Sequence, residues 1–284
     1  MFPIADVNPT RRTPIVTVLI MIACIGAWFG WQQEPQRSAG EDFVFNIEHA
    51  AIPCELVQGR PLDVQEFNAA FDPTTGGDAD SCGIGRDGAP PVVADKMVWL
   101  AAVASMFFHG GWLHIGGNLL YLWIFGNNIE DHLGPLRYLA FYLIGGLVAT
   151  ATHVALQPDS VIPVIGASGA VAAVMGAYAV WFPRAPVRTV LLLGFPILVT
   201  IKARWVLGFW FVLQFLTSPN SGVAWAAHVG GFVFGAAIGL LIRASGALRH
   251  AIWRSEYSGQ MDRRWDPTGG VGDVHEYRRW TPGR

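Results

Sequence analysis

The hydrophobic positions of this 284-residue chain gather in long windows without Asp, Glu, Lys or Arg, which are residues 13–33, 97–128, 138–158, 160–183 and 205–242. A hydrocarbon core about 30 Å thick requires roughly 20 apolar residues in a helix, so the first, third and fourth windows predict one membrane span each. The second window predicts a span near 112–130, preceded by a short apolar segment. The last window is too long for one helix, and the turn formers at 217–222 divide it into spans near 203–217 and 223–243.

The pattern therefore predicts an all-α polytopic membrane protein with a bundle of six transmembrane helices. Charged residues make up 14% of the chain, compared with about 25% in soluble domains. One apolar stretch, 189–201, has 13 residues, contains Pro196 and is too short to cross alone. We expect it to dip into the inner leaflet before the fifth span. A crossing together with the residues that follow it is the alternative.

The basic residues predict the orientation of the spans. Lys and Arg lie before the first span, after the second, between the fourth and fifth and after the sixth, whereas the short loops after the third and fifth spans contain neither. By the positive-inside rule both termini are cytoplasmic. The expected organisation is a cytoplasmic segment 1–12, a six-span domain 13–244 and a cytoplasmic polar tail 245–284.

The segment 33–96 between the first two spans is then extracytoplasmic. From Glu34 to Lys96 it contains 12 acidic and 4 basic residues. Its length and its apolar residues predict a partly folded cap. Cys54 and Cys82 in this segment can form a disulfide or remain free thiols. Cys24, in the first span, is expected to be a packing residue.

Polar groups inside a membrane are costly, so each one in a span is a candidate site. Ser168 opens the fourth span, His228 opens the sixth, and His114 and Asn118 lie in the second. All three spans start from the predicted outer side. At a rise of 1.5 Å per residue, Ser168 and His228 both lie roughly 8–9 Å below the outer surface, and His114 lies at a similar depth.

These residue types are suited to acyl transfer. A serine hydroxyl becomes nucleophilic when a neighbouring base takes its proton, and His228 is the candidate base for Ser168. The reaction also needs donors for an oxyanion. His114 and Asn118 share a helix face, and the Ser168 N–H lies in a first helical turn, where helical partners are missing. Small residues that allow helices to approach include Gly169, Gly231 and Gly235.

Each of these residues also has a simpler interpretation. A serine in a membrane helix is usually a packing residue, and Asn118 can be an interhelical hydrogen-bond partner. The shared depth favours the catalytic hypothesis over these separate explanations. Three further histidines are interpreted as structural or interfacial, namely His109, His132 and His153. The chain has no H-E-x-x-H sequence and no Asp within the predicted spans, so we expect neither a metal site nor an aspartyl protease, and no cofactor.

At these residues the chain resembles the rhomboid family of intramembrane serine proteases. The resemblance is carried by a G-x-S-G string at 166–169 that begins with Gly166, an A-H-x-x-G string at 227–231 and an H-x-x-x-N string at 114–118. Residues 8–14, before the first span, are similar to bacterial members. The resemblance implies a Ser168–His228 dyad and an oxyanion hole formed by His114, Asn118 and the Ser168 N–H. It also implies a bacterial cytoplasmic membrane location, with transmembrane proteins as substrates, cut near the outer face, and no nucleic-acid partner.

Two positions depart from some relatives. In some relatives a Tyr lies four residues after the serine, against the imidazole, whereas this chain has Ala172, so another group must orient His228. A Trp-Arg pair occurs in the first outer loop of some relatives, whereas Trp99 is followed here by Leu100.

The substrate route and two rival functions stay open. A substrate helix is hypothesised to approach between the second and fifth spans. Bulky residues of the fifth span then form either a movable gate or a lipid-facing surface, namely Trp205, Phe209, Trp210, Phe211 and Phe215. A catalytically silent rhomboid-like protein that binds or chaperones transmembrane segments is the alternative function, and it would be expected to lack the serine or the histidine. A transporter would carry charged groups at mid-membrane.

Overall fold

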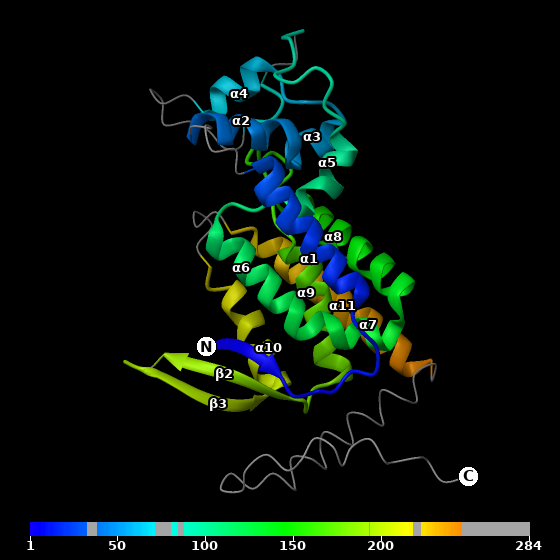
Figure 1. Ribbon diagram of the computed structural model, residues 1–284. Coiled ribbons are helices and arrows are strands. Elements are labelled where there is room, and N and C mark those ends of the chain that lie inside the picture. The colour runs from blue at the N-terminus through cyan, green and yellow to red at the C-terminus, as the bar shows by residue number, and fades with distance from the viewer. Residues whose placement is uncertain (33–38, 72–80, 85–87, 193, 218–222, 246–284) are drawn as a thin grey trace, which may run out of the picture.

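The computed structural model describes residues 1–32, 39–71, 81–84, 88–192, 194–217 and 223–245. Figure 1 shows a helical bundle with a group of short helices at one end and a small sheet at the other. The turn predicted at 217–222 lies outside the described residues except for its first residue. The polar tail predicted at 245–284 lies outside them from residue 246 onward.

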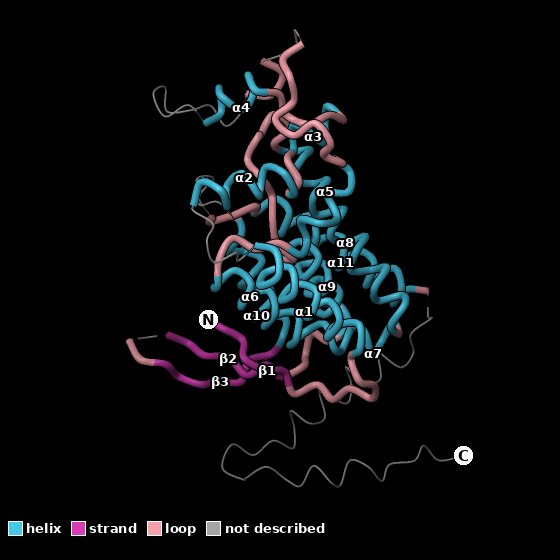
Figure 2. The backbone as a smooth tube through the Cα atoms, turned by 45° about the horizontal axis from the view of Figure 1, so that its top comes forward, coloured by secondary structure: helices cyan, strands magenta, loops and turns pink. Residues whose placement is uncertain are grey.

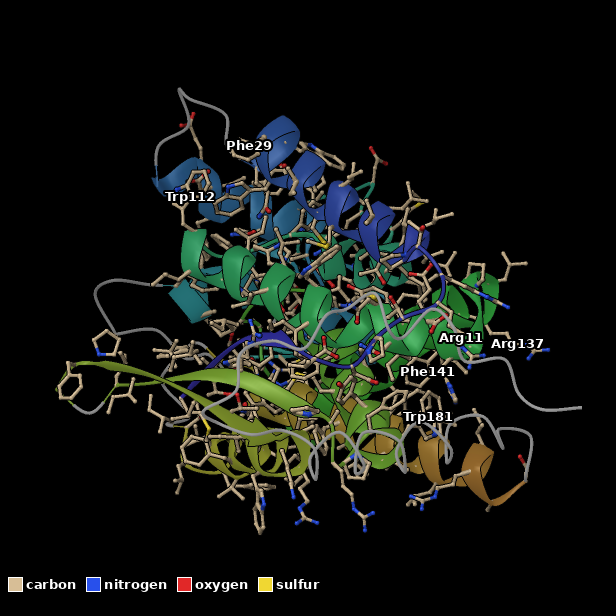
Figure 3. All side chains as sticks on the ribbon, turned by 60° about the horizontal axis from the view of Figure 1, so that its bottom comes forward. Arg11, Phe29, Trp112, Arg137, Phe141 and Trp181 are labelled. Carbon is tan, nitrogen blue, oxygen red and sulfur yellow. A yellow bond between two sulfur atoms is a disulfide. The ribbon has the colours of Figure 1, made fainter. Side chains whose placement is uncertain are left out.

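The mostly helical bundle that the hydrophobic pattern predicts is confirmed. Its elements are α1 (Ile15–Ala27) continued by η1 (Trp28–Gln32), α6 (Trp112–Tyr121) continued by η3 (Leu122–Gly126) and α7 (Asn127–Leu133), α8 (Pro135–Leu156), α9 (Ser168–Trp181), α10 (Ala203–Gln214) and α11 (Trp225–Ala244). Trp112 at the start of α6 packs edge-on against Phe29 of η1, with ring centroids 5.5 Å apart (Figure 3).

Within the described parts of the chain, fewer than six helices are long enough to span a bilayer on their own. Among the described residues, three are long and apolar enough, namely Ile15–Gln32, Pro135–Leu156 and Trp225–Ala244. A bent pair, Val98–Phe107 with Trp112–Leu133, is a fourth candidate with an angle of 80°. Helices α9 and α10 have 14 and 12 residues, fewer than the roughly 20 of a full crossing. The six-span count therefore stays a prediction.

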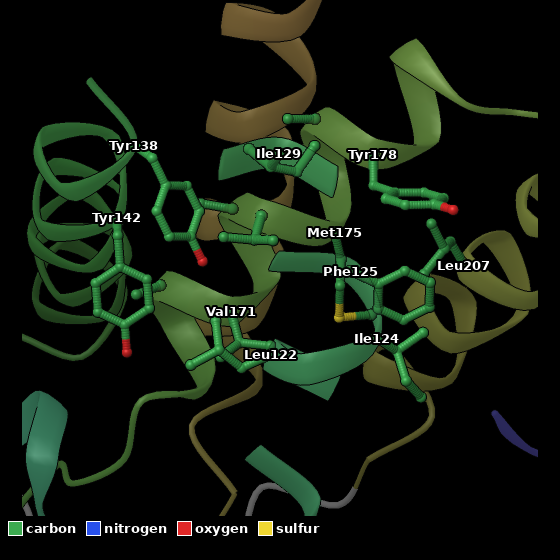
Figure 4. Packing of buried hydrophobic residues seen from close by; sticks show 14 of the residues in the cluster. Leu122, Ile124, Phe125, Ile129, Tyr138, Tyr142, Val171, Met175, Tyr178 and Leu207 are labelled. Atoms are coloured by element: carbon green, nitrogen blue, oxygen red, sulfur yellow. The ribbon is translucent and has the colours of Figure 1, made fainter. Parts of the chain in front are cut away.

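Helix α9 forms the centre of the bundle. Every residue from Gly169 to Tyr178 is buried, and Figure 4 shows Val171, Met175 and Tyr178 among side chains of the neighbouring helices. The backbones of α9 and α11 touch, because a Cβ on Gly235 would meet the Ala173 carbonyl and one on Gly231 would meet the Gly169 carbonyl. Small residues at these positions thus permit a separation that larger side chains would prevent.

The sheet, seen in Figure 2, consists of β1 (Phe2–Asp6), β2 (Pro186–Leu192) and β3 (Pro196–Lys202), antiparallel in the order β1-β2-β3. Residues 189–201 form most of the β2–β3 hairpin, so the alternative in which they cross the membrane together with the residues that follow is wrong, and the dip into the inner leaflet stays a prediction. Their β-branched residues suit strands, and Gly194, with φ +83°, lies between the strands. A sheet with a free edge leaves backbone groups unpaired and does not enter the hydrocarbon core.

Two carboxyl groups join the N-terminal segment to the bundle. Glu130 of α7 accepts hydrogen bonds from the backbone N–H groups of Val16 and Thr17, at 2.8 and 2.7 Å, and from the Thr17 hydroxyl at 2.7 Å. Asp6 accepts bonds from the Asn128 amide at 2.7 Å and the Tyr178 hydroxyl at 2.8 Å. Burial raises the pKa of the Asp6 carboxyl to about 7.

The predicted extracytoplasmic segment contains α2 (Ala39–His49), α3 (Pro53–Gln58) and α4 (Val64–Phe71), and α5 (Val98–Ala104) and η2 (Ser105–Phe107) follow it. We call the described residues between 39 and 96 the cap. The cap has its own apolar core, which includes Ile47, Ile52 and Leu62. A disulfide joins Cys54 to Cys82, and the buried Lys96 pairs with Glu55 at 2.5 Å. Cys24 is buried in the bundle core.

The cap also contacts the loop that precedes α9. The Val164 N–H donates to the Ala51 carbonyl at 2.8 Å, and the Cys54 N–H donates to the Ser160 carbonyl at 3.0 Å. These bonds fix two points of the segment that leads into Ser168.

Candidate active site

Ser168 and His228 lie in hydrogen-bond contact although 60 residues separate them. Ser168 is the first residue of α9, and His228 lies one turn into α11. The Ser168 Oγ to His228 Nε2 distance is 2.7 Å. The contact depends on the close approach of these two helices, since a Cβ on Gly231 of α11 would meet the Gly169 carbonyl of α9.

The other imidazole nitrogen of His228 contacts α10. His228 Nδ1 lies 2.7 Å from Gln214 Oε1, and Gln214 Nε2 donates to the Trp210 carbonyl at 2.8 Å. The second bond fixes which end of the Gln214 amide faces the ring, because its nitrogen is the donor. The amide oxygen therefore requires a proton on His228 Nδ1. In the neutral ring this leaves Nε2 as the acceptor for the Ser168 hydroxyl.

Sequence reasoning did not single out Gln214. It is the one residue within 205–215 with a side-chain amide or hydroxyl group. A polar group inside an apolar window is a candidate site, so this position could have indicated its role. The Trp210 ring, one turn earlier, lies 5.7 Å from the imidazole of His228. Two side chains of α10 thus contact this imidazole where a Tyr at position 172 would be expected from the family resemblance.

His114 comes to the same place from α6. The Gly110 N–H donates to His114 Nδ1 at 3.1 Å, so the neutral His114 ring carries its proton on Nε2. A Cβ placed on Gly166 would lie 2.7 Å from His114 Nε2 and 3.5 Å from Ser168 Oγ. A donor and a hydroxyl thus face one small space, which remains open because residue 166 has no side chain.

The backbone around Gly166 has an unusual conformation. Its φ of +124° favours glycine, and its N–H donates to the Ser105 carbonyl at 2.9 Å. The loop is thereby held against η2 immediately before Ser168. The N–H groups of the first turn of α9 lack helical acceptors, which makes them available donors beside the hydroxyl.

Asn118 lies one turn beyond His114 and is buried. Its amide donates to the His114 carbonyl at 3.0 Å, which uses one of its two donor hydrogens. The His109 ring packs edge-on against the His114 ring, with centroids 5.2 Å apart. The Gln32 side chain accepts a hydrogen bond from the His109 backbone N–H and donates one to the His109 carbonyl. His132 packs on the Trp181 ring at 4.5 Å.

One group of metal-ligand residue types occurs in the described part of the chain, in the cap. Cys54, Glu66 and Cys82 place their ligand atoms within 4.8 Å of one another. The two sulfur atoms are joined as a disulfide, and Glu66 pairs with Arg60 at 3.0 Å. The Glu66 carboxylate is thus paired with a guanidinium, and both sulfur atoms of the group belong to the disulfide.

A family model described as the Rhomboid domain matches residues 96–245, which are 150 of the 284 residues. The chain belongs to the rhomboid family. The match begins at the end of the cap and contains all four residues of the candidate site. As a rhomboid with several apolar helices of spanning length, the chain is an integral membrane protein.

Curated rhomboid proteins are similar over parts of their length. The presenilin-associated rhomboid-like protein A, mitochondrial, of Danio rerio is 29% identical over 67% of this chain and 45% of that protein. Rhomboid protein 1, mitochondrial, of Saccharomyces cerevisiae is 30% identical over 50% of this chain and 42% of its own length. Rhomboid-type serine protease 2 of Emericella nidulans is 29% identical over 54% of this chain and 29% of its own length. This rhomboid chain thus spans less than half the length of these relatives.

Proposed function

We propose that this rhomboid protein is an intramembrane serine endopeptidase with Ser168 as nucleophile and His228 as general base. The observation that carries the proposal is the 2.7 Å contact between Ser168 Oγ and His228 Nε2, with Gln214 on the opposite ring nitrogen. Membership of a family with a relative named a serine protease supports the same reaction class.

In the first half of the reaction, Ser168 Oγ forms a bond to the scissile carbonyl carbon while His228 Nε2 takes the hydroxyl proton. The oxyanion accepts hydrogen bonds from His114 Nε2–H and the Ser168 N–H, with the second Asn118 amide hydrogen as a further donor. The C–N bond then breaks, and His228 returns the proton to the leaving amine. Water next attacks the acyl-enzyme, with His228 again as base, and restores the serine.

Gln214 acts in this mechanism as a positioning residue. Its carbonyl oxygen accepts the Nδ1 proton, which keeps the Nε2 lone pair directed at Ser168. When His228 becomes an imidazolium, the same oxygen is already placed to stabilise the added charge. The residue does not touch the reacting atoms.

The proposed substrates are transmembrane segments of membrane proteins, which must unwind locally because a helix hides its carbonyl groups in hydrogen bonds. The site opens to the extracytoplasmic side of a bacterial cytoplasmic membrane, and both termini are cytoplasmic. The positive-inside rule supports this orientation, because the Arg11 N–H donates to Asp131 of α7 and Arg137 lies in the first turn of α8, and Figure 1 shows α7 at the bundle end opposite the cap. The proposed route passes between α6 and α10.

The first test is covalent labelling of the detergent-solubilised protein with a fluorophosphonate probe. Labelling is expected for the native chain and should disappear in Ser168→Ala. Ser105→Ala removes another buried serine, whose hydroxyl donates to the Ala102 carbonyl, and serves as the matched control. Probe attachment that persists in Ser168→Ala would locate the nucleophile elsewhere.

The second test measures cleavage of a single-span reporter substrate. His228→Ala is expected to abolish turnover while the protein remains folded. Wild-type turnover by His228→Ala would refute the dyad. An unlabelled, inactive native chain that still binds the reporter would support the silent rhomboid-like alternative.

A further inference from the structure

The β2–β3 hairpin extends sideways from the bundle. Its strands pair from Pro186↔Lys202 at the base to Leu192↔Pro196 at the tip. Figures 1 and 2 both show the hairpin running past the helices at the end opposite the cap, across the general direction of the bundle. Because β2 follows α9 and β3 leads directly into α10, the hairpin lies at the level where these membrane helices end.

The two ends of the hairpin have different surroundings. At the base, Val187 is fully buried in the bundle core, and its partner Ile201 packs against the same core. At the tip, Leu192, Phe195 and Leu198 are 60%, 67% and 61% exposed. Large apolar side chains gathered on a projecting element are costly in water and indicate a surface that is covered.

The tip is apolar on both faces of the sheet. Directly paired residues of an antiparallel ladder point to the same face, and successive residues point to opposite faces. The pair Leu191↔Ile197 therefore occupies one face, and the pair Val190↔Leu198 the other. A flat protein partner would cover one face, whereas a fluid apolar phase surrounds both.

The charge of the hairpin region has one sign. Residues 183–214 contain no Asp or Glu, and their bases lie near the hairpin base, namely Arg184, Arg188, Lys202 and Arg204. Arg184, Arg188 and Arg204 are exposed. Apolar groups that enter the acyl boundary beside basic groups at headgroup level are the combination that binds an anionic bilayer surface.

We propose that the β2–β3 hairpin is a lateral anchor that lies in the interface of the protein's own bilayer. Leu192, Phe195 and Leu198 insert at the boundary of headgroups and acyl chains, and the basic residues at the hairpin base bind acidic phospholipid headgroups. The strands stay at headgroup depth, where water satisfies the free edge of β3. The anchor is independent of the proposed hydrolysis.

The experiment places a spin label on the hairpin tip of the full chain in lipid nanodiscs. Phe195→Cys and Leu198→Cys are made in a Cys24→Ala background, because Cys24 is the free cysteine of the described residues. Collision rates of the label are measured with oxygen, which concentrates in lipid, and with a water-soluble nickel chelate. Val64→Cys in the cap provides a reference for water, and Leu240→Cys, 57% exposed on α11, provides a reference for lipid.

The expected oxygen-to-nickel ratio at both tip positions lies above that of Val64→Cys and below that of Leu240→Cys. Replacing part of the phosphatidylcholine by phosphatidylglycerol should raise the ratio, and adding Arg188→Gln and Arg204→Gln should remove this increase. A tip ratio equal to the water reference in both lipid mixtures would overturn the anchor. Low collision rates with both reagents would show that protein covers the tip, and a ratio unaffected by phosphatidylglycerol would overturn the assignment to acidic headgroups.

Discussion

The substitution Gln214→Leu tests the arrangement around His228 most directly. Leu has a similar size and suits a helix, but it offers no acceptor for the Nδ1 proton. The buried imidazole then either keeps Nδ1–H unpaired or moves its proton to Nε2, where it no longer accepts from Ser168. We therefore expect a slower reaction from a protein that still folds.

The size of the effect follows from the cost of the lost bond. An unpaired buried donor costs about 1–3 kcal/mol. Since about 1.36 kcal/mol corresponds to a tenfold rate change, kcat/KM is expected to fall roughly 5- to 160-fold. The loss should lie in kcat, because Gln214 contacts His228 and the α10 backbone, and neither contact involves the substrate.

The assay compares the second-order rate of fluorophosphonate labelling with reporter cleavage, alongside thermal denaturation in detergent. Thr217→Val is the matched control, since Thr217 is a polar residue three positions later whose hydroxyl donates to the Leu213 carbonyl. Gln214→Glu retains an acceptor and should recover part of the rate lost in Gln214→Leu. Equal labelling rates for wild type and Gln214→Leu would refute the positioning role, and so would a loss explained by unfolding alone.

Three further predictions concern stability in detergent. Gly235→Ala places a Cβ against the Ala173 carbonyl and should destabilise the fold by about 1–3 kcal/mol. Gly208→Ala, whose Cβ would have nothing within 4 Å, should be neutral or stabilising. Equal denaturation temperatures for the two variants would contradict the backbone contact. Glu130→Gln weakens three bonds to the start of α1 and should cost about 1–3 kcal/mol, as denaturation midpoints will measure. Burial raises the pKa of Asp6 from 3.8 to about 7, so its contribution to stability is fully present below pH 3.8 and lost as the pH rises through about 7. Asp6→Asn should remove this decline of stability with pH, as denaturation midpoints measured across the range will show. An unchanged pH profile would exclude Asp6 as its source.

The helices were predictable because a charge-free apolar window of about 20 residues is typical of a membrane-spanning helix. The Ser168–His228 contact was predictable for a related reason. Counting residues from the outer ends of two helices gives depth, and Ser168 and His228 share one depth. Depth does not give rotation about a helix axis, however, so Gln214 on α10 could not be assigned to the imidazole from its position along the chain.

The sheet was missed because a short apolar run does not distinguish a strand from a buried helix. Residues 189–201 become strands because the chain also supplies β1 from its first residues, and the Phe2↔Val190 pairing joins segments 188 positions apart. The residues near 189–201 in the sequence do not indicate that the first residues of the chain pair with them. The contact between the cap and the loop before Ser168 is equally nonlocal, because the Val164 N–H donates to the carbonyl of Ala51, 113 residues earlier.

Ala172 explains why the imidazole is oriented from α10. The residue is fully buried, and a Cβ on Gly231 would lie 3.3 Å from the Ala172 Cβ. A phenol ring at 172 does not fit between helices this close, so the side of His228 that a Tyr would cover in some relatives is closed by helix packing. The packing that brings Ser168 to His228 therefore also excludes that Tyr, and the Nδ1 acceptor comes from another helix. It follows that Ala172→Tyr should fail to restore activity to Gln214→Leu and should instead destabilise the α9–α11 contact.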